Sequence, residues 1–241
     1  MSKIDSKTLE QVVEDLRAAH GDNLAAVVLY GSAAAGDHHE LRSDHNLLIA
    51  LKRISTADLR AAEGAMRAWQ KRGQQIPVYF TVEELQDAAD VFPIEFLQME
   101  QARKILYGRD PFELVQISDA NLRHQTEYEL RTKLIRLRRL YIPASRSVDK
   151  LSALMTDSLA SFAALFRAVL ILMGQDPPVN KEDSVRAAVL TLNLDGAAFE
   201  RIFELRAGKG AALTEAEAND LFAKYMEQIE RVIQAVDRIE S

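Results

Sequence analysis

The residues best suited to chemistry lie in one segment of the chain, between positions 31 and 46. Gly31 and Ser32 follow an apolar run, and Asp44 and Asn46 stand two positions apart at the start of the next apolar run. Glycine lets a backbone approach a phosphate closely, and a serine or a turn N–H can donate hydrogen bonds to phosphate oxygens. Residues i and i+2 of a strand project to the same side, so Asp44 and Asn46 would face one site. The segment therefore places possible hydrogen-bond donors to an anion beside a polar pair with one carboxylate. The alternative is an ordinary turn at Gly31, with Ser32 capping the next helix and Asp44 capping the strand.

The whole arrangement resembles the signature of the nucleotidyltransferase superfamily, which includes polymerase-β-like and aminoglycoside-modifying enzymes. Gly31-Ser32 is followed by 11 residues and then by Asp44-His45-Asn46, where the family pattern has Asp-x-Asp opening a second strand. The resemblance implies that Asp44 and Asn46 occupy catalytic positions, with Asp44 as a metal ligand. It also implies that Gly31 and Ser32 bind the phosphates of a nucleoside triphosphate, with Mg²⁺ as the cofactor.

The sequence departs from the family pattern at two of the three carboxylate positions. Asn46 stands where the second carboxylate is expected, and the stretch 76–81, where the third is expected, contains no acid. Asp87 and Asp90 follow that stretch, but we expect them on a helix or turn, which makes them weak replacements. Losing two anionic ligands weakens both metal binding and transition-state stabilisation.

Two functional interpretations follow, and a purely structural role stays open beside them. In the first, the protein is a degenerate, nucleotide-binding or regulatory member, a pseudo-enzyme that acts through nucleotide or protein contacts. In the second, it is an active Mg²⁺-dependent enzyme that moves a nucleotidyl group from a nucleoside triphosphate to a hydroxyl acceptor, with Asp44 as the main ligand. The missing acids favour the first.

A basic cluster lies in the second half of the chain. Between Arg123 and Lys150 there are eight basic residues against three acids. Arg131 is our candidate for a contact to the triphosphate. The alternative is a solvated helix surface on which Glu127 and Glu129 pair with Arg131 and Lys133, since residues four apart are neighbours on a helix. In aminoglycoside-modifying relatives the helical domain supplies an acidic base, a role that Glu127 or Glu129 could also fill.

These residues need an α/β scaffold, and the first half of the chain predicts one. Apolar spacing indicates a helix over 9–16 and a second helix over 56–71. Short apolar runs indicate strands over 24–30 and 46–51. A third strand is predicted over 76–81, where Pro77 favours an edge or a strand start.

The second half predicts only helices. One helix is expected over 119–141, ended by Pro143, and another over 148–173. Asn180 can cap a shorter helix, and Thr214 with Glu217 forms a capping box for the last one. The fold class is thus an α/β (α+β) nucleotidyltransferase-like domain over 1–115 followed by an all-α helical bundle over 116–241.

Composition limits the remaining classes. The net charge of −6 argues against a general nucleic-acid binder, and the absence of cysteine excludes disulfides and thiolate metal sites. The longest apolar stretch, 162–173, contains Arg167 and predicts a buried helix, not a membrane span. With no signal-like N-terminus, we expect a cytoplasmic protein. A nucleotide or small molecule, a protein partner and a homo-oligomer are all open as partners.

Overall fold

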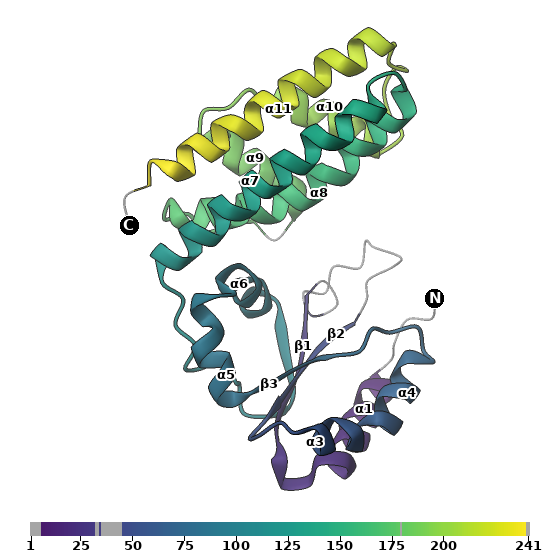
Figure 1. The fold of residues 1–241 in the computed structure, drawn as a ribbon, viewed down its shortest axis with the longest axis vertical. Helices are drawn as coiled ribbons and strands as arrows, with labels where there is room; N and C mark the ends of the chain where they lie inside the picture. The colour runs from purple at the N-terminus through teal and green to yellow at the C-terminus, as the bar shows by residue number, and fades with distance from the viewer. Residues whose placement is uncertain (1–5, 32–33, 35–44, 179, 240–241) are drawn as a thin grey trace. The chain divides into compact units, whose positions relative to one another are not determined.

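A computed structural model of the protein describes residues 6–31, 34, 45–178 and 180–239. The chain divides into two compact units, Met1–Ile117 and Ser118–Ser241, shown in Figure 1. The first unit contains a sheet covered by helices, and the described residues of the second form helices and connecting turns, with no strand among them. This is the predicted fold class.

The sheet of the first unit has four strands in the order β3-β2-β1-β4. They are β1 Leu24–Tyr30, β2 Asn46–Leu51, β3 Val78–Thr81 and β4 Arg103–Gly108. Strand β1 pairs antiparallel with β2 and β4, and β2 pairs parallel with β3. The prediction that 24–30 and 46–51 are adjacent strands is confirmed.

Helices α1 Ser6–His20, α3 Thr56–Ala61 and α4 Glu63–Gln70 cover one face of the sheet (Figure 1). Strand residues Val27 and Leu29 turn toward this side and are almost fully buried. They pack with apolar residues of the covering helices, including Leu16 and Trp69. Val27 and Leu29 are two residues apart because successive strand side chains alternate between faces.

Helices α5 Val82–Asp87 and α6 Pro93–Gln101 cover the opposite face. Ala26 and Val28 of β1 and Leu48 of β2 point to this side, where they form a second core with residues such as Phe96. The polar residues at the ends of β1 and β2 belong to this face, because they continue its two-residue alternation.

Two short 3₁₀ helices, Gly21–Asn23 and Ala88–Asp90, also belong to this unit. Asp87 ends α5 and Asp90 lies in the second of them, so both are on helical turns, as predicted. The prediction of one helix over 56–71 is wrong. Ala62, with ψ −7°, ends α3 and begins α4, because this ψ departs from the helical value and interrupts the hydrogen-bond ladder.

The predicted third strand begins later than expected, and a fourth was not predicted. Pro77 directly precedes β3, which is an edge strand, in line with the missing N–H of proline. Strand β4 is short, begins with two basic residues and is only partly buried, so its hydrophobic pattern is weak.

The second unit consists of α7 Asp119–Ala144, α8 Val148–Leu172, α9 Lys181–Thr191, α10 Ala197–Arg206 and α11 Glu215–Asp237 (Figure 1). Helix α8 is central and packs against the other four. It is long and apolar enough to cross a membrane by composition alone, but half of its most apolar window is buried in the unit. The prediction of a buried helix is confirmed.

The ends of these helices follow the predicted capping residues with one exception. Asn180 caps α9, and Thr214 with Glu217 forms the capping box of α11, as predicted. Pro143 does not end α7, which continues to Ala144. Proline removes one N–H from the last turn, and the Ser145 N–H still bonds to the Tyr141 carbonyl at 2.8 Å. Helix α10 was not predicted.

His20, at the end of α1, gives the first unit a pH-dependent stability. Its side chain is 8% exposed and lies edge-on to Tyr79, with 6.0 Å between ring centroids. Neither ring nitrogen finds a hydrogen-bond partner among the described residues. Burial lowers the pKa of His20 below its usual value, and the nearby Asp58 only partly opposes this.

We therefore expect the free energy of unfolding to fall as the pH drops below about 6.5, because the unfolded chain then binds a proton that the folded chain rejects. His20→Phe should remove this part of the pH dependence. The control His124→Phe, at an exposed position of α7, should leave it in place. Urea titrations at several pH values measure it. Equal pH slopes for the wild type and His20→Phe would contradict the assignment.

Candidate functional site

Gly31 and Asn46 lie side by side at one end of the sheet. Gly31 directly follows β1, and Asn46 opens β2 opposite Tyr30 in the antiparallel register. The Nδ2 atom of Asn46 is 3.4 Å from the position that a Cβ on Gly31 would occupy. Ser32 and Asp44, the other two residues of the predicted motif, lie outside the described residues. The structure thus brings the two described motif residues together.

The backbone at Gly31 has the conformation that favours glycine. Its φ is +84°, a region that L-residues with a side chain rarely adopt. Its N–H donates to the Ala102 carbonyl at 2.9 Å, and its own carbonyl accepts from the Ala34 N–H at 2.9 Å. The glycine therefore ends β1 with a backbone conformation that residues with a side chain adopt only under strain.

The start of β2 is held in place by the connection between α4 and β3. Gln74 is 7% exposed, and its side-chain oxygen accepts the backbone N–H of His45 at 2.9 Å. The indole N–H of Trp69 donates to the Gln75 carbonyl at 2.9 Å, which anchors the same connection to the core. These contacts fix the position of Asn46 relative to β1. His45 itself is half-buried.

No acid replaces the missing carboxylates on the neighbouring strand. Val78 of β3 pairs with Leu48 and shares the sheet face of Asn46, since Phe80, two residues on, packs in the core of that face. Val78 is 38% exposed, so a carboxylate would fit at this position. Over the ranges that the structure describes, no three His, Asp or Glu side chains gather to hold a metal ion.

Two further residues, which the sequence did not indicate, lie at the same end of the sheet as Gly31 and Asn46. Tyr30 and Arg103 pair across β1 and β4, so Arg103, Tyr30 and Asn46 form a row over three strands. Burial raises the pKa of the Tyr30 hydroxyl, which keeps it protonated. The Arg103 guanidinium binds one Asp110 oxygen through Nε at 3.0 Å and Nη2 at 2.7 Å. Its charge is therefore already paired with Asp110. Arg103 opens β4, so a prediction of this strand from the sequence would also have indicated its place in the row.

In the helical unit, Arg131 lies on the exposed surface of α7 in an ion-pair network. Its Nε is 2.8 Å from Glu127, and Nη2 is 3.6 Å from Asp237 of α11. The Arg131 hydrogen bond holds the pKa of Glu127 below its usual value. Lys133 pairs with Glu129 at 3.3 Å. The pairing of both bases with acids four residues earlier is confirmed, and the triphosphate contact of Arg131 stays a prediction.

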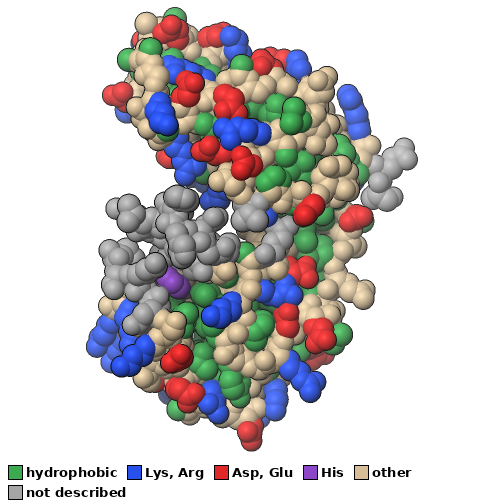
Figure 2. Space-filling view, turned by 180° about the vertical axis from the view of Figure 1, so that it is seen from behind, with side chains coloured by type: hydrophobic (Ala, Val, Ile, Leu, Met, Phe, Trp, Pro, Cys, Tyr) green, Lys and Arg blue, Asp and Glu red, His purple; other side chains and the backbone are tan. Residues whose placement is uncertain are grey.

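The charged surface has the same mixed character more widely. Figure 2 shows Lys and Arg side chains lying beside Asp and Glu side chains on the face that it presents. Arg138 adds a further pair with Glu230 at 2.8 Å. The sequence excess of basic residues in α7 is thus largely compensated by acids of α7 itself and of α11.

Comparison with known proteins supports the fold. The chain matches no family model, and it matches none of the curated proteins in sequence. In structure it is similar to the spectinomycin adenyltransferase AAD(9) from Enterococcus faecialis, solved with ATP and spectinomycin. The identity is 14%, the TM-score is 0.57, and the match covers 95% of this chain and 99% of that one. The chain therefore has a nucleotidyltransferase-like fold with a C-terminal helical domain.

The turn at Gly31 can be tested through stability. Gly31→Ala should lower the free energy of unfolding by about 1–2 kcal/mol, because a Cβ strains the left-handed backbone. Gly64→Ala, on the exposed side of α4 with nothing within 4 Å of the new Cβ, should instead raise it by about 0.5–1 kcal/mol. Chemical denaturation measures both. An unchanged stability of Gly31→Ala would show that the turn does not require glycine.

Proposed function

We propose that this protein is a nucleotidyltransferase-fold protein that keeps an anion-binding turn but has lost most of the metal-binding carboxylates. It binds a nucleotide weakly and transfers a nucleotidyl group poorly. The observation that carries the proposal is that two neighbouring strands present uncharged side chains on one sheet face, Asn46 on β2 and Val78 on β3. Carboxylates would be expected there in an active enzyme. Asp44 is then the one carboxylate left at the predicted positions.

The donor set does not fit a Mg²⁺ ion that bridges a triphosphate. Magnesium prefers octahedral oxygen ligands and is usually held by one or two carboxylates together with substrate phosphates. Asn46 supplies one neutral carbonyl oxygen, and Val78 supplies none. A single carboxylate gives weak metal binding, so the charge stabilisation that a metal contributes to phosphoryl chemistry is reduced.

The same changes favour a bare phosphate over a metal complex. The side-chain amide of Asn46 can donate a hydrogen bond, which a carboxylate in its place cannot do. It lies beside the Gly31 turn, so its N–H₂ group and the turn backbone can face the same anion. Fewer negative charges at the site also mean less repulsion of a polyphosphate.

The second candidate is an active Mg²⁺-dependent nucleotidyltransferase with a hydroxyl acceptor. The similarity to a protein solved with ATP and spectinomycin favours it, because that fold carries such an activity. In this case Asp44 would be the main metal ligand, and an acid such as Asp87, Asp90 or Glu95 would have to compensate. Asp87 and Asp90 lie on helical turns beyond β3, and Glu95 lies on α6.

An activity assay separates the two candidates. Purified protein incubated with ATP, Mg²⁺ and a hydroxyl-bearing aminocyclitol should release no more pyrophosphate than the Asp44→Ala variant does. The reason is that one carboxylate cannot assemble the metal-bridged transition state. Robust Mg²⁺-dependent release by the wild type, abolished in Asp44→Ala, would establish the active enzyme instead.

The retained anion site predicts an unusual metal dependence of binding. Calorimetric titration with ATP should give weak binding that is the same with and without Mg²⁺ and falls as salt is added. Asn46→Asp should weaken Mg²⁺-free binding by roughly tenfold, because it places a negative charge beside the phosphates and removes a donor.

Gln70→Glu is the matched control for this variant. It adds the same charge at an exposed position of α4, a helix that covers the opposite face of the sheet. ATP binding should therefore stay as in the wild type. Equal weakening by both variants would show that net charge governs binding. Absence of binding heat at millimolar ATP in folded protein would overturn the anion site.

A further inference from the structure

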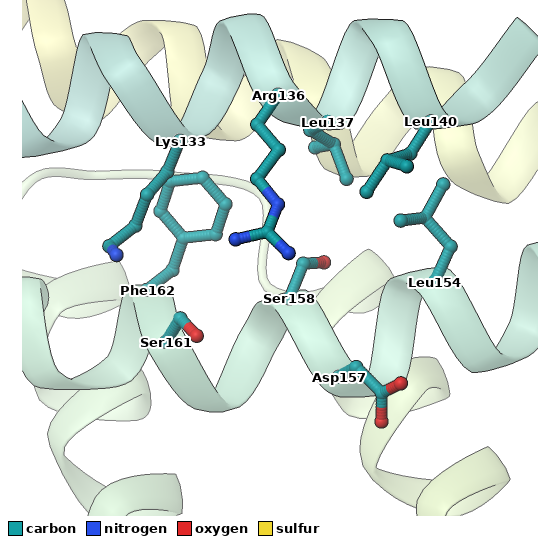
Figure 3. A pocket seen from close by; sticks show the side chains of 9 residues that line it. All are labelled: Lys133, Arg136, Leu137, Leu140, Leu154, Asp157, Ser158, Ser161 and Phe162. Atoms are coloured by element: carbon teal, nitrogen blue, oxygen red, sulfur yellow. The ribbon is translucent and has the colours of Figure 1, made fainter.

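A pocket of about 280 Å³ lies between α7 and α8, wholly within the helical unit. Helix α7 contributes Lys133, Arg136 and Leu140 to its wall, and α8 contributes Leu154, Ser158 and Ser161 (Figure 3). The α7 residues lie three to four positions apart, so they share one side of that helix. The pocket therefore combines two cations and two hydroxyls with an apolar end.

The Arg136 side chain is exposed, and it extends from α7 toward α8 across this pocket. Figure 3 shows its side chain descending from α7 between the helices, with the guanidinium beside Ser158. The ring of Phe162 lies between this guanidinium and the ammonium of Lys133. Lys133 lines the same wall, but its ammonium lies on the far side of this ring and pairs with Glu129 at 3.3 Å.

The charge of Arg136 is not compensated in the way that its neighbours are. Arg131, Lys133 and Arg138 each have an acid within 4 Å. In the part of the chain that the structure describes, Arg136 has neither an ion pair nor a hydrogen bond. The carboxylate of Asp157, which also borders the pocket, points away from the guanidinium in Figure 3. Since Lys133 is paired with Glu129, the positive charge directed at the pocket is that of the Arg136 guanidinium.

The hydroxyl wall is partly fixed and partly available. Ser158 Oγ lies 3.1 Å from the hydroxyl of Tyr225, which is fully buried in the bundle core. This contact sets the position of Ser158 on α8. Ser161, one turn further along, is exposed and can donate its hydroxyl proton to a ligand.

We propose that this pocket binds a small phosphate monoester with an apolar body. The guanidinium of Arg136 can hold two phosphate oxygens at once, and the Ser161 hydroxyl can donate to the third. Leu140 and Leu154 then receive the apolar body at the other end of the pocket. A cationic ligand would meet the like charge of Arg136. The proposal does not depend on nucleotidyl transfer, because none of these residues belongs to the sheet unit.

The test uses the full-length protein, phenyl phosphate as the probe and calorimetry at about 0.15 M salt, where diffuse attraction between exposed charges is screened. Phenyl phosphate should bind more tightly than inorganic phosphate, which lacks the apolar body, and than benzyl alcohol, which lacks the charge. Arg136→Gln should weaken phenyl phosphate binding by at least about tenfold, because it removes the bidentate charge-assisted contact. Lys133→Gln should weaken it to a smaller degree.

Arg139→Gln is the matched control, because Arg139 is an exposed arginine on the same helix that does not line the pocket. The affinity of the Arg139→Gln variant for phenyl phosphate should stay within about twofold of the wild type, since surface charge at a distance is screened. Phenyl phosphate binding that is weakened by Asn46→Asp but not by Arg136→Gln would belong to the site on the sheet and would overturn this proposal. Equal losses in Arg136→Gln and Arg139→Gln, or no binding by folded wild type at millimolar probe, would overturn the proposal.

Discussion

The antiparallel pairing of β1 with β2 is the constraint on which the candidate site depends. It places Tyr30, the last residue of β1, opposite Asn46, the first residue of β2. Gly31, which has a positive φ, directly follows Tyr30, and it therefore lies at the same end of the sheet as Asn46. Because both strands are buried on both faces, their register is fixed by packing, and a slip of one residue would turn Asn46 to the other side of the sheet.

The two faces of the sheet have different consequences for chemistry. The face under α1, α3 and α4 is filled by large apolar side chains, including Trp69. The other face carries Arg103, Tyr30 and Asn46 at its end, where the apolar core gives way to polar groups. Arg103 is neutralised by Asp110, so the row offers hydrogen-bond donors without a free charge on the sheet. Such a surface suits a weakly held anion better than a metal ion.

Sequence reasoning was most successful where hydrophobic patterns are long or continuous. The buried runs that became β1 and β2, and the spacing that became α7, α8 and α11, were read correctly because burial alone determines them. The side-by-side placement of Gly31 and Asn46 followed from those strands. Strand β4 and its Arg103 were missed because the pairing partner, β1, is far away in the sequence. The break at Ala62 was missed because alanine is a good helix former and gives no local signal.

In the helical unit, too, the sequence indicates contacts between neighbouring residues but not contacts between different helices. The pairs Arg131 with Glu127 and Lys133 with Glu129 are four residues apart on one helix, so the sequence indicates them directly. Whether Arg136 is paired depends instead on α8, which begins after the turn at the end of α7 and runs back along it. Ser158 and Ser161 have no sequence signal that relates them to Arg136. A basic helix in a chain with net charge −6 can thus carry guanidinium groups that have no ion pair within the described residues, such as those of Arg136 and Arg139. Only the packing of α7 against α8 shows that Arg136 borders a pocket.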